Sequence, residues 1–300
     1  SNPQKVVIMA TNHGGSEHAS PYVVDRDPVA PVPSVAEQFE LRLAFFDHHL
    51  KGAENGVDEW PAIRYFNLGE EALRAAEDWP PGPVTMRRLH LSRDGALSTK
   101  APEDVGADAY AVDFEVGTGA TNRWSTQMGG PVRGLSDRAA MDGRMLVYTS
   151  APLETDLQIT GAPVVTLSLS STYSDGAVLA YLEDVDPGGR SRYVTEGGLR
   201  AIHRKPWTDP RFGTDGALHS FARADAMPLV PGEIAEIRFR MWPISVLVRK
   251  GHRVRVAIAG ADNDIFDRLP AEGDVTLTLH RGLDNPSHIE LPILQTPLGD

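Results

Sequence analysis

The pattern of apolar and polar positions predicts a short α/β segment at the start of the chain. Residues 6–10 (VVIMA) form a continuous apolar run, which is typical of a fully buried parallel strand. The run ends in the polar, flexible residues 11–15 (TNHGG), so we expect a junction between a strand and a loop here. Residues 16–33 are rich in Pro and Asp and have no sustained period, which favours a long loop.

An amphipathic helix is predicted to follow this loop. Ser34 and Glu37 have the spacing of a capping box, and Lys51 with Gly52 is a typical helix end. Four apolar side chains recur at helical spacing between them: Phe39, Leu43, Phe46 and Leu50. We expect the first three to be buried against a sheet, because such a stripe is ordinarily a core face rather than a cofactor site.

Beyond residue 60 the pattern changes to many short strands separated by Gly-, Pro- and Asp-rich turns. Residues 70–78 are expected to form a short helical piece or a turn. Within residues 164–170 and 253–258 apolar and polar positions alternate, as two packed sheets require. We therefore predict a mainly β fold, with a strand, a loop and a helix in residues 1–58 and a β-sandwich in residues 59–300. The expected strands are 63–68, 84–91, 108–116, 144–149, 157–171, 176–184, 193–199, 234–243, 252–259 and 275–280.

The composition is that of an ordinary soluble globular protein. The chain has 300 residues, of which 41% are hydrophobic and 23% are charged. Asp and Glu total 41 against 29 Lys and Arg, a net charge of −12, so a nucleic acid partner is not expected. No apolar stretch is long enough to span a bilayer, so we expect no membrane contact.

Two features concern the origin of the chain. Cysteine is absent, which removes disulfides and thiolate chemistry and fits either the cytoplasm or export. Of these two compartments we favour the cytoplasm. The opening Ser1-Asn2 in place of Met favours a piece of a longer chain.

No complete catalytic motif occurs in the sequence. No serine lies in a Gly-x-Ser-x-Gly elbow, and there is no His-Glu-x-x-His, no Gly-rich phosphate loop and no EF-hand spacing. His13 is the candidate catalytic group. It follows the buried strand directly, in a Gly-flanked loop where α/β enzymes display catalytic side chains. A polar loop residue without catalytic role is the alternative.

Three further places could carry chemistry. Trp124 follows the Gly-rich residues 117–119 and either lines a substrate cleft or packs on its own loop. His48 and His49 lie near the helix end and are expected to be solvated or to cap the helix rather than bind a metal. Residues 262–267 hold three aspartates, which could suit calcium but without a dense ligand pattern usually form turns. We expect no metal and no cofactor.

Seven segments, in the same order along the chain, together carry a family likeness. They include the apolar strand and histidine turn at residues 5–14 and the aromatic-rich helix end at residues 45–52 (FFDHHLKG). The set resembles the cocaine esterase and X-prolyl dipeptidyl peptidase family of serine hydrolases. The other five segments are residues 78–81, 146–161, 184–189, 248–256 and 286–292.

The resemblance implies an α/β-hydrolase domain with a helical cap, followed by a C-terminal jelly-roll sandwich of the galactose-binding-like kind. This chain would hold only the last strand and helix of the hydrolase domain and the jelly roll. His13 is then the triad histidine, and the missing N-terminal part supplies the serine and the acid. Residues 172–176 (TYSDG) stand where the family has an Asp-x-Asp-Phe stretch. We expect Tyr173 and Asp175 of this stretch to line the substrate site together with Trp124.

The activity that the resemblance implies is hydrolysis of an ester or amide bond, X-Pro peptide bonds included, through an acyl-enzyme. The substrate is then a small ester, amide or peptide, and the missing hydrolase part is a partner. Residues 9–12 (MATN) replace the family's Gly-Pro-Trp-Thr/Ser turn, so substrate preference is not inherited. The chain alone is expected to be inactive. A non-catalytic binding module and one piece of a split hydrolase remain alternatives, and a homo-oligomer stays open.

Overall fold

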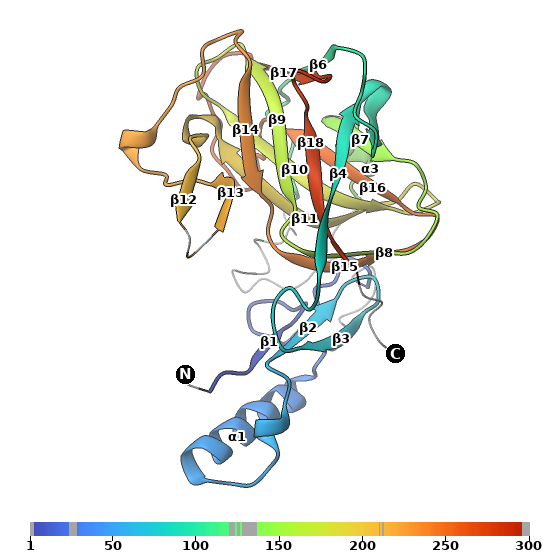
Figure 1. The fold of residues 1–300 in the computed structure, drawn as a ribbon, viewed down its shortest axis with the longest axis vertical. Coiled ribbons are helices and arrows are strands. Elements are labelled where there is room, and N and C mark those ends of the chain that lie inside the picture. Colours follow the sequence, from blue (N-terminus) through green and yellow to red (C-terminus); the bar gives the residue numbers. More distant parts are fainter. Residues whose placement is uncertain are drawn as a thin grey trace.

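The computed structural model consists of a large β-sandwich and a smaller α/β unit that projects from it (Figure 1). It describes residues 3–23, 29–119, 124, 127, 137–209, 211 and 213–295. Within those residues, no helix combines the length and the apolar character needed to cross a membrane.

The projecting unit is a three-stranded sheet with one long helix. Strand β1 (Val6–Ile8) pairs in parallel with β2 (Ile63–Asn67), which pairs antiparallel with β3 (Ala72–Ala76). Helix α1 (Val35–Lys51) and the 3-10 turn η1 (Val57–Glu59) connect β1 to β2. The expected capping box is present at the start of α1, and Gly52 ends the helix in the left-handed conformation.

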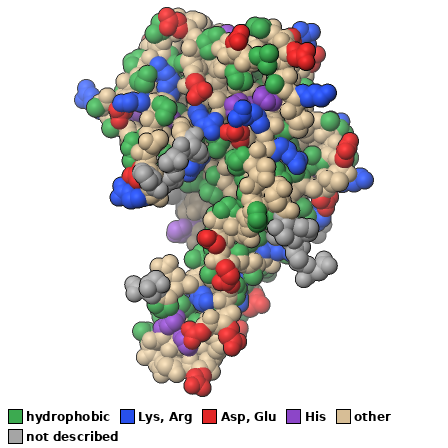
Figure 2. Space-filling view, viewed as in Figure 1, with side chains coloured by type: hydrophobic (Ala, Val, Ile, Leu, Met, Phe, Trp, Pro, Cys, Tyr) green, Lys and Arg blue, Asp and Glu red, His purple; other side chains and the backbone are tan. Residues whose placement is uncertain are grey.

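The expected burial of the helix stripe is wrong. Phe39, Leu43 and Phe46 are 66%, 59% and 54% exposed, and Leu50 is exposed as well. A small three-stranded sheet cannot cover the helix, and α1 turns the side that carries Leu41 toward β1 and β2, around a pocket of about 180 Å³. The stripe therefore remains at the surface of the projecting unit, where Figure 2 shows apolar side chains among acidic ones.

The sandwich consists of two packed layers of mostly antiparallel strands. One layer has the order β11-β10-β16-β7, and the other contains β4, β18, β9, β17 and β6, with the short β5 between the layers. Strand β9 also pairs with β14, and β8 pairs with β15 and β18. The bounds are β4 Val84–Ser92, η2 Arg93–Gly95, β5 Ala96–Ser98, β6 Gly106–Ala111, α3 Ala139–Asp142, β7 Leu146–Ser150, β8 Leu157–Gly161, β9 Val164–Ser171, β10 Ala177–Val185, β11 Ser191–Arg200, η3 Ala201–His203, β12 Trp207–Asp209, β13 Gly213–Leu218, η4 Arg223–Asp225, β14 Ala235–Arg240, β15 Ile244–Val248, β16 Arg253–Ala259, β17 Thr276–Arg281 and β18 His288–Leu294.

Strand β10 is buried on both faces. Val178, Ala180 and Leu182 belong to the main core between the layers, whereas Leu179 and Tyr181 belong to a second apolar cluster on the opposite face. Successive side chains of a strand point to opposite faces, so this double burial requires a cover on each side. The second cluster is completed by Val116, Met145, Tyr193, Ala257 and Ala259.

The mainly β fold and the C-terminal sandwich are confirmed. Several local expectations differ from the structure. The strand expected to be fully buried over residues 6–10 ends at Ile8, and its Val6 and Ile8 are 44% and 47% exposed. The strand expected over residues 157–171 is divided into β8 and β9. Residues 70–78, expected as a helical piece or turn, contain β3, and the first sandwich strand begins at Val84 rather than near residue 60. Helix-compatible residues form β3 because they pair with β2 along its whole length. The division between residues 58 and 59 stays a prediction.

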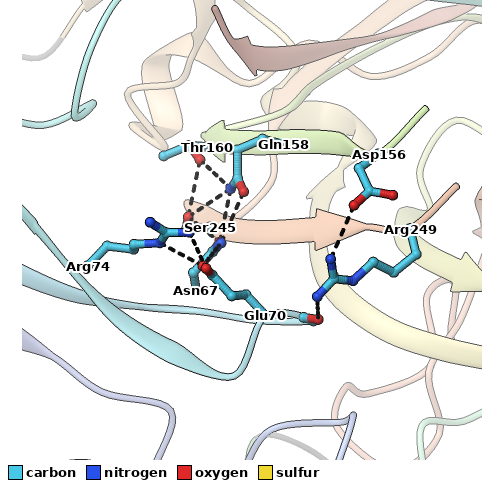
Figure 3. A network of polar contacts seen from close by, with 9 residues as sticks. Asn67, Glu70, Arg74, Asp156, Gln158, Thr160, Ser245 and Arg249 are labelled. Carbon is cyan, nitrogen blue, oxygen red and sulfur yellow. Dashed lines mark hydrogen bonds and ion pairs between the residues drawn. The ribbon is translucent and has the colours of Figure 1, made fainter. Parts of the chain in front are cut away.

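A buried polar network joins the projecting unit to the sandwich (Figure 3). Asn67, at the end of β2, is fully buried; its amide donates to Gln158 Oε1 on β8 (3.0 Å). Its Oδ1 accepts from Ser245 Oγ on β15 (2.8 Å) and from Gln158 Nε2 (2.9 Å). The same Gln158 nitrogen donates to Thr160 Oγ1 (2.9 Å). Because buried polar groups depend on such partners, the network fixes the end of β2 on the sandwich.

Backbone contacts continue this joint one residue further. Leu68 N donates to Ser245 O (3.0 Å), and Leu247 N donates to Leu68 O (2.8 Å). Gly69 then passes so close to β15 that a Cβ atom there would collide with the carbonyl oxygen of Leu247. Its φ of +75° is also one that favours glycine.

Gly69→Ala is therefore expected to lower the free energy of unfolding. A strained left-handed residue alone costs about 1–3 kcal/mol, and the collision with Leu247 should make the loss larger than that. Gly56→Ala is the matched control, because Gly56 has a φ of +76° with no atom near the added Cβ. Chemical denaturation of both variants measures the difference. Equal losses would mean that the collision with Leu247 is relieved without cost.

Candidate functional site

The loop after β1 is a tight turn with His13 at its tip. The backbone closes below the tip through a hydrogen bond from Ala19 N to Ala10 O (2.8 Å). Asn12 closes the turn itself, because its Oδ1 accepts from the backbone N–H of Ser16 (3.0 Å). His13 is exposed to solvent, and the buried Asn12 beside it shows that the turn is packed at its base.

A second histidine, His18, forms part of that base. It is only 5% exposed; its Nδ1 donates to Ala10 O (2.8 Å), and its Nε2 lies 3.4 Å from Glu71 Oε2. Its ring meets that of Phe66 edge-on. Burial lowers the pKa of His18, but the hydrogen bonds to Glu71 and Ala10 and the charge of Glu71 outweigh burial, so the pKa is raised. His18 therefore acts as a brace and leaves His13 as the exposed histidine of the loop.

Side chains from three other elements hold the same loop. Gln38 of α1 is buried and donates to Gly15 O (2.8 Å). Ser20 Oγ donates to Glu71 Oε1 (2.8 Å), next to β3. Tyr22 Oη donates to Oδ2 of Asp184 (2.8 Å), which belongs to β10 of the sandwich. His13 thus stands on a turn that is braced by the helix, the small sheet and the sandwich.

Trp124 lies at a different place, in a pocket of about 340 Å³ on the sandwich. Its Nε1 donates to Glu196 Oε1 (3.0 Å), and Glu196 is a buried carboxylate on β11. Trp242 and Phe266 also line the pocket, so it presents apolar rings beside the charged residues Glu196, Arg200, Asp262 and Asp267. His13 is not among its lining residues.

Tyr173 and Asp175 do not line this pocket. Asp175 reaches its edge through Arg200, a lining residue whose Nη2 lies 2.6 Å from Asp175 Oδ2. Tyr173 packs against the main core, and its hydroxyl lies where a side chain at Gly273 would have to be. The expectation that Trp124, Tyr173 and Asp175 line a substrate site stays a prediction.

Two of the three aspartates in residues 262–267 serve the fold. Asp262 is buried, and its carboxylate accepts from Tyr181 Oη (2.8 Å), from Thr118 Oγ1 (3.0 Å) and from Thr118 N (3.2 Å). Asp264 Oδ2 accepts from Gly119 N (2.7 Å). These carboxylates therefore anchor the Gly-rich residues that precede Trp124. Among the described residues no group of three or more His, Cys, Asp or Glu side chains could hold a metal ion.

Comparison with known proteins adds a family to this geometry. Residues 55–290 match the family described as the X-Pro dipeptidyl-peptidase C-terminal non-catalytic domain. The chain belongs to this family. The resemblance to the cocaine esterase and X-prolyl dipeptidyl peptidase family is confirmed, and the segments at residues 5–14 and 45–52 lie outside the matched range. The match begins at residue 55, after the end of α1. The His13 loop therefore lies before the domain that is described as non-catalytic.

Relatives of this chain are longer proteins. A protein of Mycobacterium bovis, provisionally named a serine esterase, is 46% identical over 256 residues, which are 84% of this chain and 40% of that protein. The cocaine esterase of a Rhodococcus species is 27% identical over 293 residues, which are 89% of this chain and 48% of that protein. The chain thus spans less than half the length of these curated relatives.

Solved structures agree on the fold. An α-amino acid ester hydrolase superposes with a TM-score of 0.66 at 23% identity, over 87% of this chain and 45% of that one. An aminopeptidase from a marine-sediment archaeon gives a TM-score of 0.68 at 23% identity, over the same shares of the two chains.

Several residues around the His13 loop are not apparent as site residues from sequence reasoning. His18 and Tyr22 lie in a segment without periodicity, and Glu71 lies in one expected to be a turn. Asp184 and His252, whose Nδ1 lies 2.7 Å from Asp184 Oδ1, do lie in two of the family-like segments, 184–189 and 248–256, but the segments do not indicate their roles.

Proposed function

We propose that this chain is the C-terminal part of a serine hydrolase that cleaves ester or amide bonds, X-Pro peptide bonds among them, through an acyl-enzyme. His13 is the general base, and the serine and the acid come from an N-terminal part. The observation that carries the proposal is the exposed His13 on a turn braced from three sides, in the loop that follows the parallel strand β1. A histidine held this way but left uncovered is suited to partners outside the described residues.

The chemistry needs both nitrogens of the His13 ring. One accepts the proton of the serine hydroxyl as its oxygen attacks the carbonyl carbon, and then gives that proton to the leaving alcohol or amine. In the second half-reaction it accepts a proton from the attacking water and gives a proton to the serine oxygen as the bond between that oxygen and the acyl carbon breaks. The other nitrogen donates to the acid that orients the ring. Within the described residues the His13 ring makes no hydrogen bond, which is consistent with both roles.

The projecting unit offers a surface for the hydrolase part. Strand β1 is at the edge of its sheet and pairs only with β2 among the described strands. Val6 and Ile8 of β1 are 44% and 47% exposed, and the stripe on α1 is exposed as well. An open edge strand beside an uncovered apolar helix face is what a larger parallel sheet would complete. We infer that the hydrolase part continues the sheet from β1 and covers α1.

The pocket at Trp124 is proposed as part of the substrate wall. Its aromatic lining suits the apolar portion of a small ester, amide or peptide, and Asp175, acting through Arg200, shapes its rim.

A second candidate function is a non-catalytic binding module. One observation favours it: His13 is exposed and lines none of three pockets. These are the pocket at Trp124, the pocket between α1 and β1, and the pocket between β1 and β15. The Trp124 pocket would then be the binding site, and the His13 loop only a structural turn.

Activity and labelling distinguish the two candidates. The longer protein that contains this chain should hydrolyse p-nitrophenyl esters or proline-containing dipeptide amides and should react with a fluorophosphonate probe at a serine outside this chain. This chain alone should do neither, because it contains no nucleophile elbow. Turnover by this chain alone with a labelled serine, or a longer protein inert toward both substrates and probe, would overturn the proposal.

A further inference from the structure

A buried carboxylate connects the sandwich to the His13 loop. Asp184, near the end of β10, has a fully buried side chain. Its Oδ2 accepts from Tyr22 Oη (2.8 Å), and its Oδ1 accepts from His252 Nδ1 (2.7 Å). Tyr22, Asp184 and His252 come from three segments far apart in the sequence. We call these three residues the latch.

The latch is rigid on the sandwich side. Asp184 lies in a strand that pairs on both edges, with Arg192 of β11 and Val254 of β16 as its neighbours. His252 follows a turn in which Gly251 has a φ of +82°, and its carbonyl accepts from Leu153 N (2.8 Å). A carboxylate this buried is stable only when its oxygens are hydrogen-bonded, so the geometry of the latch is closely determined.

The latch also reaches His13 on the other side through a short path. Tyr22 packs on the main core, and its backbone N–H donates to Ser20 Oγ (3.2 Å). Ser20 donates to Glu71, which also contacts His18, and His18 holds Ala10 at the base of the turn. A shift of Tyr22 would therefore be passed to the turn that carries His13.

We propose that Asp184, held by His252, is a positioning residue that fixes the His13 loop through Tyr22. The inference rests on the proposed function, and it gives the domain described as non-catalytic a defined part in that reaction. None of the three latch residues needs to touch substrate. Their effect is on how often the His13 ring stands in the productive orientation.

The test uses Tyr22→Phe in the longer protein, because it removes only the hydroxyl. We expect kcat to fall by about 10- to 100-fold, since a small displacement of a catalytic group costs this much. KM should change less than about threefold, because binding contacts are untouched. His252→Asn should keep more activity than His252→Ala, because an amide nitrogen can replace Nδ1 as the donor to Asp184.

Tyr148→Phe is the matched control. Tyr148 is buried and its Oη donates to Asp108 Oδ2 (2.7 Å), so this variant also loses one tyrosine–aspartate hydrogen bond, away from the His13 loop and with a carboxylate that is 28% exposed. It should keep kcat at the wild-type value. If Tyr22→Phe and Tyr148→Phe have the same kcat, a merely structural role explains the latch and the proposal is wrong.

Hydrogen–deuterium exchange on this 300-residue chain separates the inference from the proposed function. Exchange of the amides of residues 10–19 should be faster in Tyr22→Phe than in the wild type and unchanged in Tyr148→Phe. If His13→Ala leaves the longer protein active, the proposed function fails, and faster exchange in Tyr22→Phe still supports the latch as the device that fixes this loop. Unchanged exchange in Tyr22→Phe overturns it.

Discussion

Replacing His13 by alanine in the longer protein is expected to remove nearly all turnover while the melting temperature stays close to that of the wild type. Loss of a general base typically costs about 10²–10⁴-fold in rate, and loss of a triad member can cost more because the triad acts as a unit. The side chain is exposed at the tip of its turn, so its removal leaves no cavity. Steady-state kinetics together with a thermal melt measure both quantities.

The choice of control for this experiment depends on the structure. From the sequence alone, His18→Ala is the control, because His18 is five positions on in the same loop and belongs to no motif. Its rate is then expected to stay within about tenfold of the wild-type rate. The structure shows His18 buried against Phe66 and bonded to Ala10, so His18→Ala should lower both stability and rate. His203, on η3 of the sandwich, is the better control. Near-native turnover in His13→Ala would show that the loop is not the family's catalytic turn.

Local signals explain what could be predicted from the sequence. The capping box and Gly52 give the ends of α1, because capping depends on residues within one turn of the helix. Alternating apolar positions likewise give most sandwich strands within a few residues, since the period of a strand is fixed by its own geometry. The position of His13 after an apolar strand belongs to the same class of signal.

Features that depend on distant partners could not be predicted. Residues 72–76 form β3 only because β2 is beside them, and the burial of the α1 stripe depends on what covers it, not on its spacing. The latch joins positions 22 and 184, which no local pattern relates. The sequence could mark His13 as a catalytic candidate, but its braces at His18, Tyr22 and Glu71 required the folded chain.

A buried ion pair next to the latch determines the second large effect. Arg138 is 6% exposed, and its Nε donates to Glu183 Oε1 (2.7 Å), whose side chain is fully buried on β10 beside Asp184. Ser191 Oγ donates to the other oxygen of Glu183 (2.8 Å). Arg138→Met would leave that carboxylate buried without its cation. Removing one partner of a buried pair costs about 3–5 kcal/mol, and we expect a loss of that size in the free energy of unfolding.

The pH dependence of that loss has a definite sign. Burial raises the pKa of Glu183, and without Arg138 the pKa should rise further. A carboxyl with a raised pKa in the folded state contributes stability at low pH and loses it as the pH rises through that pKa. The destabilisation of Arg138→Met should therefore be larger at pH 9 than at pH 5. The double variant with Glu183→Gln should recover part of the loss and remove its pH dependence.

Arg144→Met supplies the comparison, because Arg144 pairs with Asp113 at the same 2.7 Å distance but with both side chains partly exposed to solvent. Exposed pairs contribute little, so this variant should melt close to the wild type. Denaturation curves of all three variants at the two pH values test the argument. If Arg138→Met were no less stable than Arg144→Met, the carboxylate of Glu183 would be neutralised without Arg138. The ion pair would then not account for the rigidity of β10 at the latch.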